Sequence, residues 1–419
     1  MKVVHLNTYN SGGAGIAGQR LVNALNSVKP AIATIQTSAD ATNTTNFSSK
    51  FLKLATTTNF VADIAFFALK EANLKYRFAF SPGLFGRDIS QSKKVRDADI
   101  IHIHWINQGF LSINDLKKLT ALGKPIVWTL HDMWAFTGGC HYSGTCDHFK
   151  NECGNCYYLN NPNNSDLSHK GWLRKQDFYT TTSKISFVAC SNWMAGIAHQ
   201  SSLLKDFNIE AIPNPVDISL FVPMDKATLR KNRNINPDAH IVLFGAFNIL
   251  DNRKGISYLI EALNLLKNQI APNEKIEIVI FGKNKSFNTD LLPFKVHDFS
   301  VITSPIELAE IYNLANVFVM PSLEDNLPNM VMEALSCGTP VVAFNNGGVI
   351  DMVIHQENGY LADYLSAEDL ANGIVWVLNQ KDRSRLQLNA RKKVENDFSP
   401  EIVAKKYIEV YQKLLNTHI

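Results

Sequence analysis

Residues 320–348 read MPSLEDNLPNMVMEALSCGTPVVAFNNGG, and this stretch decides the fold. It begins at the end of an apolar run, Val317–Met320, that is typical of a buried strand. A polar loop follows, and Pro328 with Asn329 makes a helix start, because a proline in the first helical turn loses no hydrogen bond. A glycine ends that helix, and a second apolar run, Val341–Phe344, follows. The order strand, loop, helix, strand predicts a parallel α/β sheet.

The loop after the first of these strands lies where parallel sheets bind ligands, beyond the carboxyl end of a strand. Free N–H groups and the positive dipole end of the helix can hold a diphosphate there. We expect this binding segment to comprise Asn326, Leu327, Pro328, Asn329 and Met330. Asp325 and Glu333 flank it, and their carboxylates can accept hydrogen bonds from sugar hydroxyls. The alternative is that both acids cap a helix and face water.

This segment resembles the E-x7-E region of the retaining glycosyltransferase family 4, whose members often read E-G-F-P-N-x-x-x-E-A before C-G-T-P-V-V. Asp325 stands where that family usually has glutamate, and the neighbouring Glu324 offers an alternative register. The resemblance implies that Glu333 holds the ribose of a nucleotide sugar and that Asp325 holds the donor sugar.

The length and composition indicate a folded chain with more than one core. At 419 residues two domains are expected, and contents of 46% hydrophobic and 19% charged residues are typical of globular proteins. No apolar run approaches the ~20 residues that a membrane span needs. The N-terminus enters a strand directly, unlike a signal peptide. We therefore expect a cytoplasmic protein with reduced cysteines, in peripheral contact with the inner face of the cell membrane.

The segment AIPNPVD at residues 211–217 has the proline and asparagine content of a domain junction. We expect an N-terminal, acceptor-side Rossmann-like domain over 1–212 and a nucleotide-sugar-binding Rossmann-like domain over 213–398. A final helix over 399–419 should cross back to the first domain. The first domain has a net positive charge, which suits an anionic lipid-linked acceptor or membrane surface, although ordinary surface scatter is an equal alternative. No basic stripe indicates nucleic acid.

Glycines and a histidine mark the ligand side of the first domain. Gly13 and Gly15 allow close approach of the backbone to a ligand at a helix start, and the resemblance places this loop at the interdomain cleft. His131 follows a buried strand and can donate to a sugar hydroxyl; the resemblance places it beside the donor sugar. The alternative is that His131 is a core histidine whose hydrogen bonds are all made within the protein. His102 and His104 share a strand face, but without a third ligand nearby we favour a polar role over a metal site.

An insertion carries four cysteines: Cys140, Cys146, Cys153 and Cys156. Their spacing fits a tetrahedral structural zinc site, with His141 and His148 as stand-in ligands. An iron–sulfur cluster and disulfides are less favoured alternatives. The insertion resembles a subgroup of family 4 in exopolysaccharide and lipopolysaccharide assembly. We expect residues 138–158 to form a metal-stapled flap on the acceptor side.

The second half carries the cations for a diphosphate. Arg253 and Lys254 precede a helix, and adjacent cations there can neutralise the charge of a leaving diphosphate. The resemblance places a phosphate-binding lysine here, and a solvated pair is the alternative. Many family members carry a further arginine where this chain has Ala246 or Phe247. Lys283 follows a strand at the place where the family contacts the nucleotide base.

These features predict an α/β chain with two facing Rossmann-like domains, the GT-B architecture, and an interdomain cleft. The resemblance implies transfer of a hexose, with retention, from a UDP or GDP sugar to a hydroxyl of a glycan or lipid-linked saccharide. The expected catalytic residues are His131, Asp325, Glu333, Arg253 and Lys254. No cofactor is expected for catalysis. A GT-B epimerase or phosphorylase and a catalytically silent sugar-nucleotide-binding protein are the alternatives.

Overall fold

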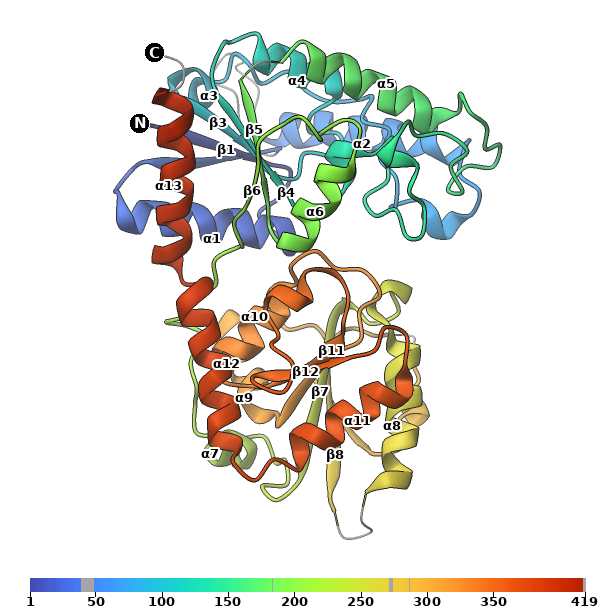
Figure 1. Cartoon of the computed structure of the whole chain (residues 1–419), viewed down its shortest axis with the longest axis vertical. Coiled ribbons are helices and arrows are strands. Elements are labelled where there is room, and N and C mark those ends of the chain that lie inside the picture. The colour runs from blue at the N-terminus through green and yellow to red at the C-terminus, as the bar shows by residue number, and fades with distance from the viewer. Residues whose placement is uncertain (39–48, 183, 271–273, 286, 417–419) are drawn as a thin grey trace. The chain divides into compact units, whose positions relative to one another are not determined.

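The computed structural model describes residues 1–38, 49–182, 184–270, 274–285 and 287–416. The chain divides into two compact units. The first consists of Met1–Asn214 together with Val403–Ile419, and the second is Pro215–Ile402 (Figure 1).

The first unit is built on a six-stranded parallel sheet in the order β2-β1-β3-β4-β5-β6 (Figure 1). Its strands are β1 Val3–Asn7, β2 Ala33–Thr37, β3 Ile100–Ile103, β4 Ile126–Leu130, β5 Ile185–Ala189 and β6 Ile209–Ala211. Every residue of β1, β3, β4 and β5 is buried, as expected for central parallel strands covered on both faces.

Helices from both ends of the chain cover this sheet. The helices of this unit are α1 Gly12–Val28, α2 Ser49–Ala68, α3 Lys93–Asp97, α4 Ile113–Thr120, α5 Leu167–Thr180, α6 Asn192–Gln200 and α13 Pro400–Asn416. Tyr407 and Tyr411 of α13 are fully buried in one apolar cluster with Leu25 of α1 and Val127 of β4. The last helix therefore completes the core of the first unit.

The second unit repeats the plan with a parallel sheet in the order β12-β11-β10-β7-β8-β9 (Figure 1). Its strands are β7 His240–Asn248, β8 Ile276–Lys283, β9 Lys295–Asp298, β10 Val317–Met320, β11 Val341–Phe344 and β12 Gly359–Ala362. Its helices are α7 Lys226–Asn232, α8 Ile256–Gln269, α9 Pro305–Leu314, α10 Asn329–Ser336, α11 Ala367–Leu378 and α12 Arg383–Asp397. The predicted α/β class with two Rossmann-like domains is confirmed.

Within the second unit, β10 and β11 pair in parallel and α10 connects them. The loop that precedes α10 thus leaves the carboxyl end of a central strand, where the strands of such a sheet direct their loops toward ligands. None of the helices in the described part of the chain is long and apolar enough to cross a membrane.

Candidate active site

The structure brings two of the predicted donor-site residues into direct contact. Lys254 lies in the short 3-10 helix Asn252–Lys254, and its Nζ donates to Oδ2 of Asp325 at 2.5 Å. Both side chains are partly buried, with exposed fractions of 26% and 18%. The ammonium group of Lys254 is therefore held beside the loop that leads into α10.

Arg253 is arranged differently from its neighbour. Its guanidinium donates to both carboxylate oxygens of Asp251, with the closest contact at 2.7 Å, and half of the arginine side chain is exposed. Burial raises the pKa of Asp251, but the hydrogen bonds and charge of Arg253 outweigh it and lower the pKa overall. Lys254 thus contacts the β10–α10 loop through its side chain, while Arg253 is paired with Asp251.

Backbone packing fixes the position of this lysine. Leu323 N donates to Arg253 O at 2.7 Å, which ties the 3-10 helix to the loop after β10. Gly255 follows with a φ of +69°, and a Cβ at this position would lie 1.9 Å from Pro321 O. Only glycine fits such an approach of backbone to backbone.

We expect Gly255→Ala to lower the free energy of unfolding by about 3 kcal/mol, since the backbone must shift as well as adopt a left-handed conformation. Gly338→Ala is the matched control, because Gly338 has a φ of +73° with its nearest neighbour atom at 3.5 Å. The control should lose only about 1 kcal/mol. Urea unfolding of both variants measures the difference, and equal losses would contradict the steric argument.

Glu333 lies in α10 and is only 3% exposed. The hydroxyl of Tyr312, itself fully buried on α9, donates to Glu333 Oε2 at 3.0 Å. This contact fixes the carboxylate against the inner side of its helix. The ribose-binding role of Glu333 stays a prediction.

The remaining predicted donor residues surround the start of α10. Pro328 is the N-cap and has no side-chain cap hydrogen bond, while Asn326 and Leu327 are buried in the preceding loop. Asn329 and Met330, the first residues of the helix, are partly buried. Gly348 N donates to Asp325 O at 3.1 Å, so the loop after β11 braces the site from its other side.

Sequence reasoning did not single out an aromatic side chain near Lys283. Lys283 ends β8, and its Nζ lies 4.5 Å from the ring centroid of Phe247. Phe247 is 69% exposed, which is unusual for an aromatic residue of a central strand. A register shift between β7 and β8 at this point turns the ring outward. An exposed aromatic ring therefore lies beside a cation at the end of β8.

His131 of the first unit is the first residue after β4 and is held at both ring nitrogens. Its Nε2 lies 2.9 Å from His104 Nδ1, and its Nδ1 lies 3.6 Å from Cys190 Sγ. Burial lowers the pKa of His131 to about 4, although the charge of Asp132 opposes this shift. The imidazole is therefore neutral at physiological pH, and its contact with a sugar stays a prediction.

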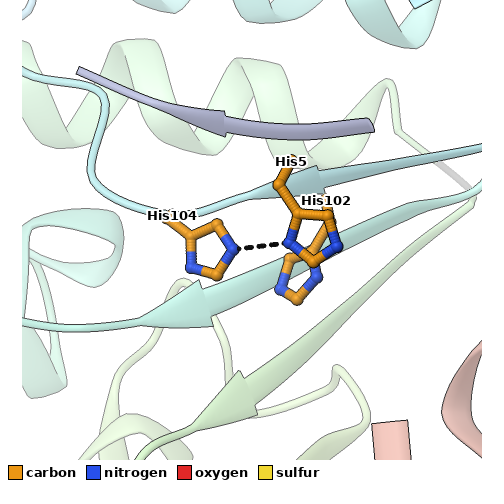
Figure 2. Close-up of side chains that lie close together, drawn as sticks. All are labelled: His5, His102 and His104. Atoms are coloured by element: carbon orange, nitrogen blue, oxygen red, sulfur yellow. Dashed lines mark hydrogen bonds between the residues drawn. The ribbon is translucent and has the colours of Figure 1, made fainter. Parts of the chain in front are cut away.

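The expectation that His102 and His104 lack a third partner is wrong. The parallel register of β1 and β3 places His5 opposite His102, and His5 Nδ1 lies 2.9 Å from His104 Nε2 (Figure 2). Ligand atoms of the three residues lie within 4.8 Å of one another, and among the described residues this is the one group of three or more with such spacing. The three side chains are at most 3% exposed.

Four buried neutral histidines should make the protein sensitive to acid. Burial lowers the pKa of His5 to about 3 and those of His102 and His104 well below 6.5. The unfolded chain takes up these protons below about pH 6.5, so the free energy of unfolding should fall there by about 1.4 kcal/mol per pH unit for each histidine. Urea unfolding from about pH 7.5 down to 4.5 measures the slope. A flat profile would contradict the burial of neutral imidazoles.

The four predicted zinc ligands are free thiols, and Cys153 and Cys156 are buried. Burial raises the pKa of Cys153 to about 11 and that of Cys156 to about 12. Cys153 Sγ also accepts a hydrogen bond from Gly138 N at 3.1 Å. The sulfur atoms of Cys140, Cys146, Cys153 and Cys156 do not meet the spacing that the three histidines satisfy within the described residues. The zinc site stays a prediction.

The glycine-rich turn borders a cavity of about 440 Å³ in the first unit. Gly15 is buried in the first turns of α1, and a Cβ there would lie 2.7 Å from Tyr9 O, whereas Gly13 faces open space. The cavity is lined mainly by hydroxyl and amide side chains, among them Thr8, Tyr9, Asn10, Ser11, Thr37 and Ser38. Such a lining suits a saccharide, which offers many hydroxyl groups.

Comparison with known families matches both units. Residues 53–220 match the family described as Glycosyltransferase Family 4, and residues 238–380 match Glycosyl transferases group 1. The second match contains Lys254, Asp325 and Glu333. Each unit of the chain is thus similar to glycosyltransferases, the first unit to Family 4 and the second to group 1.

The relatives of this chain differ in the share of their own length that it matches. A D-inositol 3-phosphate glycosyltransferase from Pseudarthrobacter chlorophenolicus is 32% identical over 172 residues, 39% of this chain and 40% of that protein. The chain therefore spans about two fifths of the length of such relatives. The putative colanic acid biosynthesis glycosyl transferase WcaC of Escherichia coli K12 is 24% identical over 332 residues, 75% of each protein.

A solved structure with the same fold covers nearly the whole chain. Anabaena HepE, crystallised in complex with UDP and glucose, matches 99% of this chain and all of its own, with a TM-score of 0.61 and 17% identity. This likeness shows that the chain has the GT-B fold.

Proposed function

We propose that this chain is a retaining glycosyltransferase that moves a hexose from a UDP or GDP sugar to a hydroxyl of a glycan or lipid-linked saccharide in surface polysaccharide assembly. The observation that carries the proposal is the Lys254–Asp325 ion pair beside the start of α10. The colanic acid relative supports the polysaccharide class, and UDP with glucose in HepE supports the donor class.

The diphosphate of the donor would rest on the backbone N–H groups at the start of α10. Lys254 would then bind both the phosphate and Asp325, and Arg253 would approach from its pair with Asp251. As the glycosidic bond breaks, negative charge grows on the leaving diphosphate, and a cation already held in place stabilises it without reorganisation. The leaving phosphate itself would assist approach of the acceptor hydroxyl on the same face, which retains the anomeric configuration.

The other donor contacts follow from the same placement. Glu333, held by Tyr312, would accept hydrogen bonds from the ribose hydroxyls, and Asp325 would accept from the donor sugar. The exposed ring of Phe247 beside Lys283 offers a stacking surface for the nucleotide base. This aromatic contact would take the place of the family's additional arginine.

The first domain would supply the acceptor side. Gly13, Gly15 and the hydroxyl-lined cavity would take the acceptor saccharide, and His131 would donate to a sugar hydroxyl. The Cys140–Cys156 insertion would be a zinc-stapled flap on this side, in a cytoplasmic protein that contacts the membrane surface peripherally. Elemental analysis after gentle purification tests the metal, with one zinc per chain expected and a metal-free protein contradicting it.

A panel of UDP, GDP and ADP sugars, each with and without a lipid-linked saccharide acceptor, tests the function. Wild type should release nucleotide from one donor class in an acceptor-dependent manner, and Glu333→Ala should not. Tight nucleotide binding without release under any condition would favour the silent binding protein. Product NMR would then report the anomeric configuration, and inversion would contradict the proposed mechanism.

A further inference from the structure

We propose that His5, His104 and His131 form a hydrogen-bonded imidazole chain in which His104 is a positioning residue that fixes the ring orientation and the tautomer of His131. The inference deepens the proposed function and rests on it only for the catalytic consequence. The hydrogen-bonded imidazole chain itself is present in the first domain without any substrate.

The strand order of the sheet brings the residues of the imidazole chain next to one another. His104, His131 and Cys190 are each the first residue after successive neighbouring strands, β3, β4 and β5. Their polar atoms therefore meet along the carboxyl edge of the sheet. His5 joins from β1, whose parallel register with β3 brings it to the same face (Figure 2).

The contacts repeat with the same orientation. His5 Nδ1 meets His104 Nε2 at 2.9 Å, and His104 Nδ1 meets His131 Nε2 at 2.9 Å. His131 Nδ1 then meets Cys190 Sγ at 3.6 Å, and Cys190 Sγ donates to Asn214 Oδ1 at 3.4 Å. Each neutral imidazole has one N–H donor and one acceptor nitrogen, so the tautomer of one ring determines that of the next.

Both ends of the imidazole chain favour one direction of hydrogen-bond donation, from His5 toward His131. At one end the Cys190 thiol donates to an amide oxygen, so its sulfur is left to accept from His131 Nδ1–H. At the other end His5 Nε2 is buried and has no partner among the described residues. The reverse direction would place an N–H at this atom, and an orphaned buried donor is rarer than an orphaned acceptor. His131 is therefore assigned the Nδ1–H tautomer, with its Nε2 accepting from His104.

The same contacts argue against a metal ion among His5, His102 and His104. Both nitrogens of His102 are already bonded at 2.7 Å, Nδ1 to the Tyr411 hydroxyl and Nε2 to Thr129 Oγ1. Three-histidine ligation would have to break one of the two hydrogen bonds of His104 and one of the two hydrogen bonds of His102. We therefore assign the cluster to hydrogen bonding.

This arrangement defines which atom of His131 serves a substrate. The His131–Cys190 contact joins a nitrogen donor to a weak sulfur acceptor at 3.6 Å, so it is the weakest link of the chain. A sugar hydroxyl oxygen can replace the sulfur as acceptor of Nδ1–H. Meanwhile the bond from His104 keeps the ring oriented and neutral, as the second partner of a functional histidine does elsewhere.

Nitrogen-15 NMR of histidine-labelled, full-length protein at about pH 7.5 reads the tautomers directly, with the His131 signals assigned from their loss in His131→Asn. Wild type should show Nδ1–H at His131, and His104→Leu should shift the population toward Nε2–H. His104→Asn, whose amide can replace the lost donor, should restore Nδ1–H. His102→Leu is the matched control from the same strand and face and should leave His131 unchanged.

Where transfer is measurable, His104→Leu should lower kcat about tenfold with little change in the donor KM, and His104→Asn should recover most of it. An Nε2–H tautomer in wild type, a tautomer insensitive to His104→Leu, or one metal ion per chain that His5→Leu removes would each overturn the inference. The NMR measurement needs no substrate. If it shows the expected tautomers in a protein without transferase activity, the imidazole chain is supported and only the proposed function is rejected.

Discussion

Replacing Glu333 by glutamine is expected to lower kcat/KM for the nucleotide sugar about 10²-fold, equivalent to about 3 kcal/mol. The carboxylate is 3% exposed and held by Tyr312, so it is preorganised as a charged acceptor. Hydrogen bonds to a charged acceptor contribute about 1.5–3 kcal/mol each, and a ribose offers two hydroxyls. Steady-state kinetics with the active donor from the panel measures the loss, which should fall mainly on KM.

Glu324→Gln is the matched control for this experiment. Glu324 lies in the same loop as Asp325, is partly buried and provides the alternative register of the motif. It should change kcat/KM by less than about twofold, the size typical of a surface substitution. A larger loss in Glu324→Gln than in Glu333→Gln would show that the motif is read in the wrong register.

Lys254→Met is expected to lower kcat about 10²- to 10³-fold, the loss seen when one preorganised electrostatic contact to a transition state is removed. Methionine keeps the aliphatic stem but removes the charge that pairs with Asp325. The loss should appear in kcat, because charge on the leaving diphosphate grows in the transition state. Rapid-mixing measurements of nucleotide release give this rate.

Arg253→Met provides the comparison, because Arg253 is a neighbouring cation whose guanidinium is engaged by Asp251. Its loss should cost about tenfold, as expected for a half-exposed charge. If the two variants lose activity equally, the direct contact of Lys254 with the loop has no special role. If Arg253→Met loses more, the assignment of the principal cation is wrong.

The sequence predicted the parallel sheets well because the buried strands are short apolar runs between polar loops. The expected strands at Val317–Met320 and Val341–Phe344 are β10 and β11, and the expected helix start at Asn329 is that of α10. These features are local, so the periodicity and turn chemistry of one segment are sufficient to place them.

Features that depend on strand order could not be predicted in this way. His5 is separated from His104 by 99 positions, and only the parallel pairing of β1 with β3 brings them together. The exposure of Phe247 depends on a register shift between β7 and β8, for which the sequence gives no signal. The sequence also could not show that Arg253 pairs with Asp251 whereas Lys254 pairs with Asp325, because these partners depend on the directions of the side chains.

The central claim is that the second domain holds the diphosphate of an activated sugar between Lys254 and the start of α10. Calorimetric titration of UDP and GDP into wild type and Lys254→Met tests it most directly. We predict that wild type binds one of the two nucleotides and that Lys254→Met binds the same nucleotide at least about tenfold more weakly, a difference of about 1.4 kcal/mol. Equal affinities in the two proteins, or no binding of either nucleotide to wild type, would contradict the account.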